Sequence, residues 1–391
     1  MKIIIMGPIL SSDLSTLINE KDLKKIPVGH GVSHLSNLAL SLVELGYMVS
    51  IITLSPDIDN DKIFIYKNKK IKIIFCPLRK SIFRLRGVLF RKEVNFLTEA
   101  LNKEKSNVIH SNWIYEYALA AWNSKRKYIL TSHDIPHKIF KYQKTILRLT
   151  RLIMGFISLR RSKILTTPSQ YAKFETQKLT NSKITVIPNT ALNNTLFKKK
   201  LVKRDMSKDI KIIMINNGFN KFKNVEAGLY AFKQFNLKYP TSSLHLFGSQ
   251  MKKNESCYTW AQKMNLTNNV NFIGHVEHIQ LMKIFNKFDI LLHTSLEETF
   301  GTIYLEAMIN GLPIVAGKYS GATKEIIKNN GILVDVSKKK EIVNALFKYA
   351  NNSILWKKKR FNAYNYVKKN FNNKDITKKF LKIYKKNMNK I

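Results

Sequence analysis

Short apolar runs alternate with amphipathic stretches along most of the chain, and the second half repeats the scheme. The apolar runs have the length and composition of buried strands, whereas Val32–Leu45, Val225–Lys238 and Thr302–Asn310 have helical periodicity. Gly46 follows the first of these helices and is suited to end it. Such alternation predicts parallel sheets that are covered by helices on both faces. The predicted strands are Ile3–Met6, Val49–Thr53, Ile71–Phe75, Val108–His110, Tyr128–Ser132, Ile164–Thr167, Thr185–Ile187, Lys211–Ile215, Ser243–Phe247, Val270–Ile273, Ile290–His293, Pro313–Ala316 and Ile332–Val334.

Length and hydrophobic content predict two domains of similar size. The chain has 391 residues, of which 45% are hydrophobic, so each half can bury a core. The polar, basic stretch Lys198–Lys208 separates the halves and is predicted to be a linker. Cys76 and Cys257 lie far apart, which argues against a disulfide framework and favours a reducing cytosol. The apolar N-terminal run is too short for a signal peptide's core, and no run approaches the roughly 18 apolar residues of a membrane span.

The formal net charge of +41 points first to an anionic partner. Nucleic acid attracts basic surfaces through counterion release, and each Lys or Arg near anionic headgroups adds about 1 kcal/mol to membrane binding. The excess, however, is mainly Lys, accompanies many Asn and Ile, and is spread along the chain, so we attribute most of it to compositional bias. No zinc-finger spacing or aromatic RNA-binding motif supports a nucleic acid partner.

Two basic amphipathic segments concentrate charge in the first half. Arg79–Lys92 and Lys138–Arg151 place apolar residues among cations, as segments in a membrane interface do. Helices whose apolar faces pack on a sheet have the same pattern, so either segment alone leaves both interpretations open. Together they predict contact with an anionic membrane, with Arg84, Arg86 and Arg91 among the contacting cations.

The most informative motif runs from His293 to Pro313 and has the pattern of a buried strand, a short acidic loop and a helix that opens near Gly301. Such an arrangement points backbone N–H groups and the positive end of the helix dipole at one place, which suits an anion. Glu298 in the loop and Glu306 on the helix flank that place. Ionised carboxylates only accept hydrogen bonds, so their natural partners are hydroxyl groups. An anion site beside two hydroxyl acceptors indicates a sugar-nucleotide pocket.

This motif resembles the signature of GT-B glycosyltransferases of family 4. Seven residues separate Glu298 from Glu306, Phe300-Gly301 follows the first Glu, and Glu-Ala-Met with Gly-x-Pro surrounds the second. The resemblance implies an α/β protein of two Rossmann-like domains facing a cleft, with a C-terminal helix that crosses back to the N-terminal domain. It implies an acceptor-binding domain over residues 1–200, a sugar-nucleotide-binding domain over 209–375, and the returning helix over 376–391.

The same resemblance assigns roles in the second half. It implies that Glu306 binds the ribose hydroxyls and that Glu298 binds the hydroxyls of the donor sugar. It also implies that the donor diphosphate is bound by Lys223 and by the N–H groups of Phe300, Gly301 and Thr302. The family's diphosphate-binding Arg is replaced by Phe219, and Lys221 is a candidate substitute that lacks a two-pronged guanidinium. The nucleobase is assigned to the loop with Gly274 and His275, although a simple strand-to-turn glycine explains Gly274 equally well.

In the first half the resemblance assigns three residues. His133, after a predicted strand, matches a family histidine near the donor sugar and the acceptor, although a purely structural histidine is the ordinary alternative. Gly29 and Gly31 match a glycine-rich acceptor or phosphate loop, and glycines also serve simple turns. Asp57 and Asp59 fit the metal motif of the other large glycosyltransferase fold, GT-A, but lie in a polar loop without its context, so we interpret them as a solvated turn.

The sequence thus predicts a retaining hexosyltransferase that works without a metal or other cofactor. Its expected partners are a nucleotide-diphosphate sugar and a glycan acceptor, expected to be lipid-linked, as in O-antigen, lipopolysaccharide or capsule assembly. Its expected location is the cytoplasmic face of the bacterial membrane, as a peripheral protein, without nucleic acid. The alternatives are a sugar-nucleotide epimerase of related fold and a non-enzymatic nucleic-acid-binding protein. The sugar, the base and the acceptor are not specified.

Overall fold

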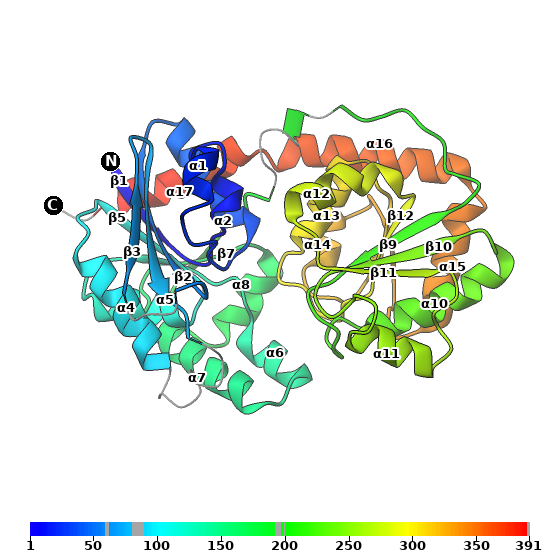
Figure 1. Ribbon diagram of the computed structural model, residues 1–391, viewed down its shortest axis with the longest axis horizontal. Helices are drawn as coiled ribbons and strands as arrows, with labels where there is room; N and C mark the ends of the chain where they lie inside the picture. Colours follow the sequence, from blue (N-terminus) through cyan, green and yellow to red (C-terminus); the bar gives the residue numbers. More distant parts are fainter. Residues whose placement is uncertain (59–61, 80–89, 192–196, 199, 389–391) are drawn as a thin grey trace. The chain divides into compact units, whose positions relative to one another are not determined.

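The structure, a computed structural model, describes residues 1–58, 62–79, 90–191, 197–198 and 200–388. The chain packs as two compact units, one formed by Met1–Asn193 with Asn373–Ile391 and the other by Asn194–Asn372. Each unit contains one main sheet with helices packed against it (Figure 1). The predicted α/β class is confirmed, and every predicted strand is present to within two residues at either end.

The sheet of the first unit is parallel except at one edge, where β3 runs antiparallel to β4. The chain builds outward from β1 to β2 and β4, then returns to the other side of β1 to add β5, β6, β7 and β8. The order of construction therefore reverses between β1 and β5. In spatial order the strands are β3 (Phe64–Lys67), β4 (Ile71–Pro77), β2 (Met48–Ser55), β1 (Lys2–Met6), β5 (Val108–Asn112), β6 (Ile129–Thr131), β7 (Leu165–Thr167) and β8 (Ile184–Val186).

The sheet of the second unit is parallel throughout and has the same plan. Its order of construction reverses between β9 and β12, at the centre of the sheet. In spatial order the strands are β11 (Val270–Gly274), β10 (Ser243–Phe247), β9 (Lys211–Ile215), β12 (Ile290–His293), β13 (Ile314–Gly317) and β14 (Ile332–Val334). In sheets of this type, ligands bind beyond the carboxyl ends of the strands at the point of reversal.

The core of the first unit lies on both faces of its sheet, because successive strand residues point to opposite sides. Ile3 and Ile5 pack in the cluster that includes α2 and α17, whereas Ile4 and Met6 pack in the one that includes α4, α5 and α7. The helices of this unit are η1 (Ser12–Leu14), α1 (Glu20–Leu23), α2 (Ser33–Glu44), α4 (Arg91–Asn102), α5 (Glu116–Asn123), α6 (Pro136–Tyr142), α7 (Ile146–Arg161), α8 (Gln170–Gln177) and α17 (Asn373–Lys386).

The core of the second unit includes α10 and α15, which pack on each other beside the strands. On the other side α13 lies next to α16, and its residues from Tyr304 to Ile309 are all buried. The helices of this unit are α10 (Val225–Lys238), α11 (Ser256–Lys263), α12 (His278–Ile284), η3 (Phe285–Lys287), α13 (Thr302–Ile309), α14 (Thr323–Ile327), α15 (Lys339–Ala350) and α16 (Ser353–Asn370).

The last helix belongs to the first unit, although it follows the whole of the second along the chain. It lies beside α2 (Figure 1). Its residues Ile376, Phe380, Leu381 and Tyr384 are buried in the core cluster that includes α2. The Tyr384 hydroxyl lies 2.6 Å from Nδ1 of His110 on β5. The other nitrogen of His110 lies 2.7 Å from the Thr131 hydroxyl on β6, so this imidazole joins α17 to the sheet.

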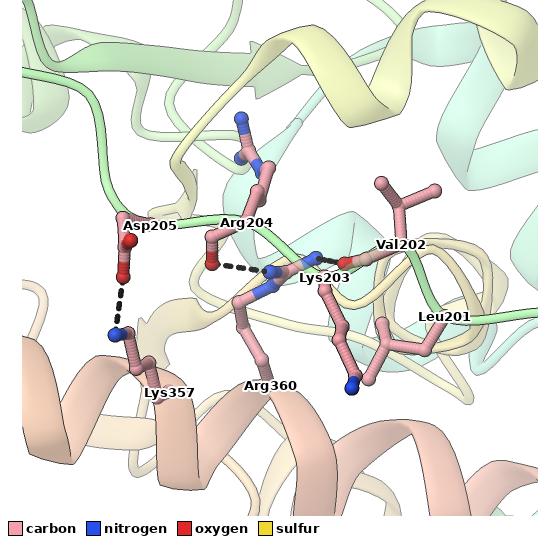
Figure 2. Close-up of a pocket in the computed structure, with 7 residues that line it drawn as sticks. All are labelled: Leu201, Val202, Lys203, Arg204, Asp205, Lys357 and Arg360. Atoms are coloured by element: carbon pink, nitrogen blue, oxygen red, sulfur yellow. Dashed lines mark hydrogen bonds and ion pairs between the residues drawn. The ribbon is translucent and has the colours of Figure 1, made fainter.

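The predicted linker is held on α16 and therefore belongs to the second unit. The Arg360 guanidinium donates to the carbonyl oxygens of Val202 and Arg204, at 3.0 and 3.3 Å (Figure 2). It also donates to the carbonyl oxygen of Gly311, which follows α13, at 2.7 Å. A cavity of about 420 Å³ lies beside these contacts and is lined by residues of the linker and of α16. Burial, with the charge of Arg204 adding to it, lowers the pKa of Arg360 to about 10. Two of these bonds go to linker carbonyls and the third to Gly311, so Arg360 ties the linker to α16 and to the end of α13.

Candidate active site

A buried ionic cluster lies at the reversal point of the second sheet. Glu298 follows β12 and accepts two hydrogen bonds on one carboxylate oxygen, from Lys223 Nζ at 2.8 Å and from His293 Nε2 at 3.0 Å. Lys223 comes from the loop after β9, so the two neighbouring central strands supply the partners. The side chains are 14%, 16% and 3% exposed, in the order Glu298, Lys223, His293, so solvent screens their interaction weakly.

The cluster keeps Glu298 ionised. Burial acts against the charged carboxylate, but the charge of Lys223 and the hydrogen bond from His293 outweigh it and hold the pKa well below its ordinary value. Because an ionised carboxylate can only accept, His293 carries its hydrogen on Nε2. Its Nδ1 is buried without a hydrogen-bond partner among the described residues. His293 opens the sequence motif, but no role was predicted for it; its position five residues before Glu298 was the available signal.

The loop between β9 and α10 shapes this cluster through asparagines. The Lys223 N–H is bonded to the side chain of Asn220 at 3.1 Å, and Asn224 has a left-handed backbone, with φ of 49°. Phe219, at the position of the family's Arg, packs on the core instead, with its ring 5.6 Å from that of Trp260. Lys221 is exposed. Its role as a substitute stays a prediction.

Helix α13 begins at the predicted residue and points its N-terminus at the loop that carries Glu298. Gly301 caps it with φ of 73°, and a side chain there would collide with the Tyr304 ring. No side chain caps this terminus, and its first turn has no acidic residue, so the positive end of the dipole is not offset locally. Phe300 is buried and anchors the loop against Phe371, with ring centres 6.2 Å apart.

Glu306 lies on α13 and is 4% exposed. One of its carboxylate oxygens lies 2.8 Å from Nε2 of His278, the first residue of α12. His278 was not predicted as a site residue, although it lies only three residues beyond His275. Gly274 ends β11 with φ of 83°, and an added Cβ would lie 2.8 Å from the Cβ of Lys252, which explains the glycine by packing. His275 is exposed.

The first unit has its own polar cluster at its reversal point, formed by aromatic rings and an amide. His133 follows β6, and its Nε2 lies 3.0 Å from the side-chain oxygen of Asn112, at the end of β5. The Asn112 amide nitrogen donates to carbonyl oxygens of Met6 and His110, so its oxygen must accept from His133. His133 therefore carries its hydrogen on Nε2, and Nδ1 is left as an acceptor. No described residue bonds to that Nδ1.

The ring of His34, the second residue of α2, lies beside His133. The two ring centres are 4.6 Å apart, and Trp113 lies 4.9 Å from His133 and 5.9 Å from His34. Burial lowers the pKa of His34 to about 3 and that of His133 well below its ordinary value, with the charges of His34 and His110 adding to the latter shift. Both imidazoles are thus neutral near pH 7. They suit neutral hydroxyl ligands better than anionic ones.

The two glycines of the first unit have a packing role. Gly29, with φ of 83°, pairs with Leu10 through a β-bridge, and an added Cβ would overlap the Ile9 carbonyl. A Cβ on Gly31 would lie 2.5 Å from the Cα of Ile9. These contacts explain why glycine is needed at both positions, and the acceptor-loop assignment stays a prediction. Asp57 accepts from the Val28 N–H at 2.9 Å, as a turn residue does, and Asp59 lies outside the described residues.

In the part of the chain that the structure describes, no three His, Cys, Asp or Glu side chains gather as metal ligands. Likewise, none of the described helices is long and apolar enough to span a bilayer.

Two units, each built on a doubly wound and mainly parallel sheet, have the architecture of the GT-B class of glycosyltransferases. The crystal structure of Anabaena HepE in complex with UDP-glucose has this fold: its TM-score to this chain is 0.68, at 17% identity, covering 99% of this chain and 100% of that one. Residues 196–370 match the family described as glycosyl transferases group 1, and residues 31–190 match glycosyltransferase family 4. The chain belongs to this family, the group 1 or family 4 glycosyltransferases.

Two relatives show how far the similarity extends. A protein of Haemophilus influenzae named an uncharacterized glycosyltransferase is 27% identical over 327 residues, which are 82% of this chain and 86% of the relative. A human protein named as part of phosphatidylinositol N-acetylglucosaminyltransferase is 24% identical over 313 residues, which are 78% of this chain and 63% of that protein. Both alignments span most of this chain, so the similarity is not confined to the Glu298 motif.

Proposed function

We propose that the protein transfers a sugar, with retention of its anomeric configuration and without a metal, from a nucleotide-diphosphate sugar to a lipid-linked glycan in bacterial surface polysaccharide assembly. The observation that carries this proposal is the ionic cluster of Lys223, Glu298 and His293 beside the N-terminus of α13. It combines a cation, an uncapped helix terminus and an ionised hydroxyl acceptor, which are what a diphosphate sugar needs. HepE, which has the same fold, binds UDP-glucose.

The diphosphate is bound by Lys223 together with the N–H groups of Phe300, Gly301 and Thr302. Glu298 already offsets part of the charge of Lys223. The N-terminus of α13 therefore neutralises more of the diphosphate charge than it would if Lys223 had no acidic partner. An ammonium has three N–H donors, so Lys223 can bond a phosphate oxygen while it holds Glu298. This fixed electrostatic site does the work that a divalent cation does elsewhere.

Glu298 binds the donor sugar, and Glu306, held by His278, binds the ribose. The low pKa of Glu298 makes it a poor proton acceptor, so it is unsuited to act as the general base. The leaving phosphate is then the group that takes the acceptor proton, in an attack on the face from which it departs. In the first unit, Nδ1 of the neutral His133 accepts a hydrogen bond from a sugar hydroxyl.

The lipid-linked acceptor and the membrane location rest on different grounds. The human relative is named for transfer to phosphatidylinositol, a membrane lipid. The basic, apolar segment Lys138–Arg151 favours an anionic bilayer surface. Sugar transfer at the cytoplasmic face of the membrane is consistent with a lipid-linked acceptor and with contact with an anionic bilayer.

The first test is a thermal-shift screen over UDP-, GDP-, ADP- and dTDP-sugars. A donor at about a hundred times its Kd stabilises the protein by about 2.7 kcal/mol, so the correct one raises Tm clearly. Lys223→Met should abolish the shift, whereas Lys318→Met, at an exposed lysine, should leave it intact. The proposal is wrong if no sugar nucleotide shifts Tm.

Product analysis then tests the chemistry. With the donor identified, turnover should persist in excess EDTA, and the product should have the anomeric configuration of the donor by NMR. Loss of activity in EDTA that Mn²⁺ restores would overturn metal independence. Conversion of the donor without any acceptor would show an epimerase instead.

A further inference from the structure

Helix α7 exposes an apolar stripe. Ile146, Leu149, Ile153 and Phe156 are 78%, 44%, 45% and 39% exposed. Their spacing of three, four and three residues places them on one side of the helix, within an arc of about 80° at 100° per residue. Exposed apolar residues are ordinary when scattered, but a continuous stripe of them marks an interaction surface. We refer to these four residues as the α7 stripe.

The α7 stripe is separate from the face that packs on the first unit. That inner face contributes Met154, Gly155, Ser158 and Leu159, which are buried. Arg151 also turns inward: its guanidinium pairs with Glu116 on α5 at 2.8 Å and lies 4.4 Å from the centre of the Tyr115 ring. The helix therefore has enough apolar side chains to pack on the unit and still present a second apolar face.

The surroundings of the stripe are cationic. Between Ile135 and Phe174 the sequence has nine Lys or Arg and no Asp or Glu. Lys144 precedes the stripe and is exposed, and Arg160, also exposed, lies on the same side of the helix with its guanidinium 4.2 Å from the centre of the Phe156 ring. Arg161 is exposed and lies 4.0 Å from the ring centre of Trp122 on α5. Apolar side chains between exposed cations are typical of helices that lie in an anionic lipid interface.

We propose that the α7 stripe, with Lys144, Arg160 and Arg161, seats the first unit on the surface of an anionic phospholipid bilayer. The proposal rests on the membrane location given above and deepens it by naming the element that makes the contact. A second copy of this chain fits poorly, because pairing two such faces would set cations against cations with no acid in the segment to offset them. The bilayer supplies both an apolar layer for the stripe and phosphates for the cations.

The structure also changes which residues of the two predicted membrane segments are available for contact with lipid. In Lys138–Arg151, Arg151 forms the buried pair described above, and Arg148 bonds to Gln143 at 2.7 Å, so the contact moves along the chain to residues 144–161. In Arg79–Lys92, residues 80–89, which include Arg84 and Arg86, lie outside the described residues. Arg79 pairs with the buried Glu93 at 2.8 Å, whereas Arg91 is exposed.

The test is co-sedimentation of the full chain with vesicles of equal parts phosphatidylglycerol and phosphatidylcholine, beside vesicles of phosphatidylcholine alone. The test variant carries Ile146→Gln, Leu149→Gln, Ile153→Gln and Phe156→Gln, all at exposed positions. The matched control carries Ile354→Gln and Phe361→Gln, which are 78% and 58% exposed on the basic helix α16 of the other unit. A third variant carries Lys144→Glu, Arg160→Glu and Arg161→Glu.

The wild type and the α16 control should bind the anionic vesicles and not the neutral ones, with binding that falls as salt rises. The stripe variant should lose roughly tenfold or more in binding, since its apolar anchors are gone, and the charge variant should lose binding at low salt. Wild-type binding by the stripe variant, or equal losses in the stripe variant and the α16 control, would overturn the proposal. A dimer that the stripe variant dissociates in the absence of vesicles would overturn it in favour of self-association.

Donor binding separates this proposal from the proposed function. The stripe variant should give the same sugar-nucleotide shift in Tm as the wild type, because the α7 stripe is not part of the donor site. An unchanged donor shift with lost vesicle binding supports the docking face. Vesicle binding through the stripe without any donor shift would keep the docking face and overturn the donor assignment instead.

Discussion

At the residue scale, Glu298 and Glu306 differ in what holds them. Glu298 is bonded to Lys223 in the loop after β9 and to His293 at the end of β12, whereas Glu306 is bonded to a histidine at the start of another helix. Glu306→Gln should weaken nucleotide binding by roughly tenfold or more, because a charged hydrogen bond becomes a neutral one. Glu298→Gln should mainly lower kcat, since its partner is the sugar in transfer. Titration calorimetry and initial rates test this, and equal mild effects of both changes would contradict it.

The low pKa of Glu298 also predicts a pH dependence of stability. The carboxyl in the unfolded chain has a pKa of about 4.3, and in the folded protein it takes up its proton only at lower pH. The stabilisation is therefore fully present above about pH 5 and is lost as the pH falls below that. Urea denaturation should show that the difference in free energy of unfolding between wild type and Glu298→Gln shrinks over that fall. A constant difference would show that the pKa is not lowered.

The buried imidazoles add a second loss of stability at acid pH. Burial lowers the pKa of both His34 and His110 to about 3, whereas histidines in the unfolded chain take up protons near pH 6.5. The unfolded state therefore binds more protons below that value, and stability falls with pH. His34→Gln should flatten the plot of unfolding free energy against pH between about 7 and about 5. An unchanged slope in His34→Gln would contradict the lowered pKa of this imidazole.

At the scale of elements, the structure confirms the strands because each is an apolar run bounded by polar residues. The exception is β3, which was not predicted. It is an antiparallel edge strand whose residues are mostly exposed, so no buried run marks it. The residues of the Glu298 motif are likewise readable from local spacing. Partners from other elements were harder to predict. His278 bonds Glu306 and Asn112 bonds His133, and only the topology brings each pair together.

The attachment of the linker to α16 gives a prediction about a single element. Arg360→Met removes donors from three carbonyl groups and leaves them unsatisfied beside a buried side chain. We expect a loss of about 2–3 kcal/mol in the free energy of unfolding, since each unmet buried group costs about 1 kcal/mol or more. Lys357→Met, at an exposed ion pair with Asp205 in the same cavity, should cost little. Similar losses in both variants would show that the clamp does not stabilise the linker.

At the scale of the whole molecule, acidic residues are scarcer at the surface than in the sequence as a whole. The chain has 26 Asp and Glu, and several of them are buried in internal pairs, including Glu93, Glu104, Glu116 and Asp289. Most of the 67 Lys and Arg remain at the surface, where long basic side chains normally lie. Each of these pairs also holds a cation, so the net charge is unchanged, but cations outnumber anions at the surface by a larger factor than in the composition. Membrane binding should therefore depend steeply on salt.

The division into units predicts how the molecule responds to truncation. Removing residues 373–391 exposes the apolar surface that Ile376, Phe380 and Tyr384 cover, and leaves Nδ1 of His110 buried without a partner. The first unit should then unfold or aggregate, while residues 194–372 keep their own core and the donor site of Lys223, Glu298 and Glu306. Calorimetry should show one of two transitions lost. Unchanged melting of both units would contradict the role given to α17.

The position of α17 also bears on the order of events during synthesis. The ribosome makes residues 1–193 first, yet the helix that completes their unit emerges only after residues 194–372 have been translated. Until then, the apolar side of β1 and α2 lacks its cover, and the nascent chain must carry an unfinished first unit while the second can fold at once. The first unit is thus synthesised first but completes its folding last. A chain that stops before α17 has a folded second unit joined to a first unit with exposed apolar surface. Such a product is a natural target for chaperones and proteases, so the packing of α17 decides whether the first unit escapes them.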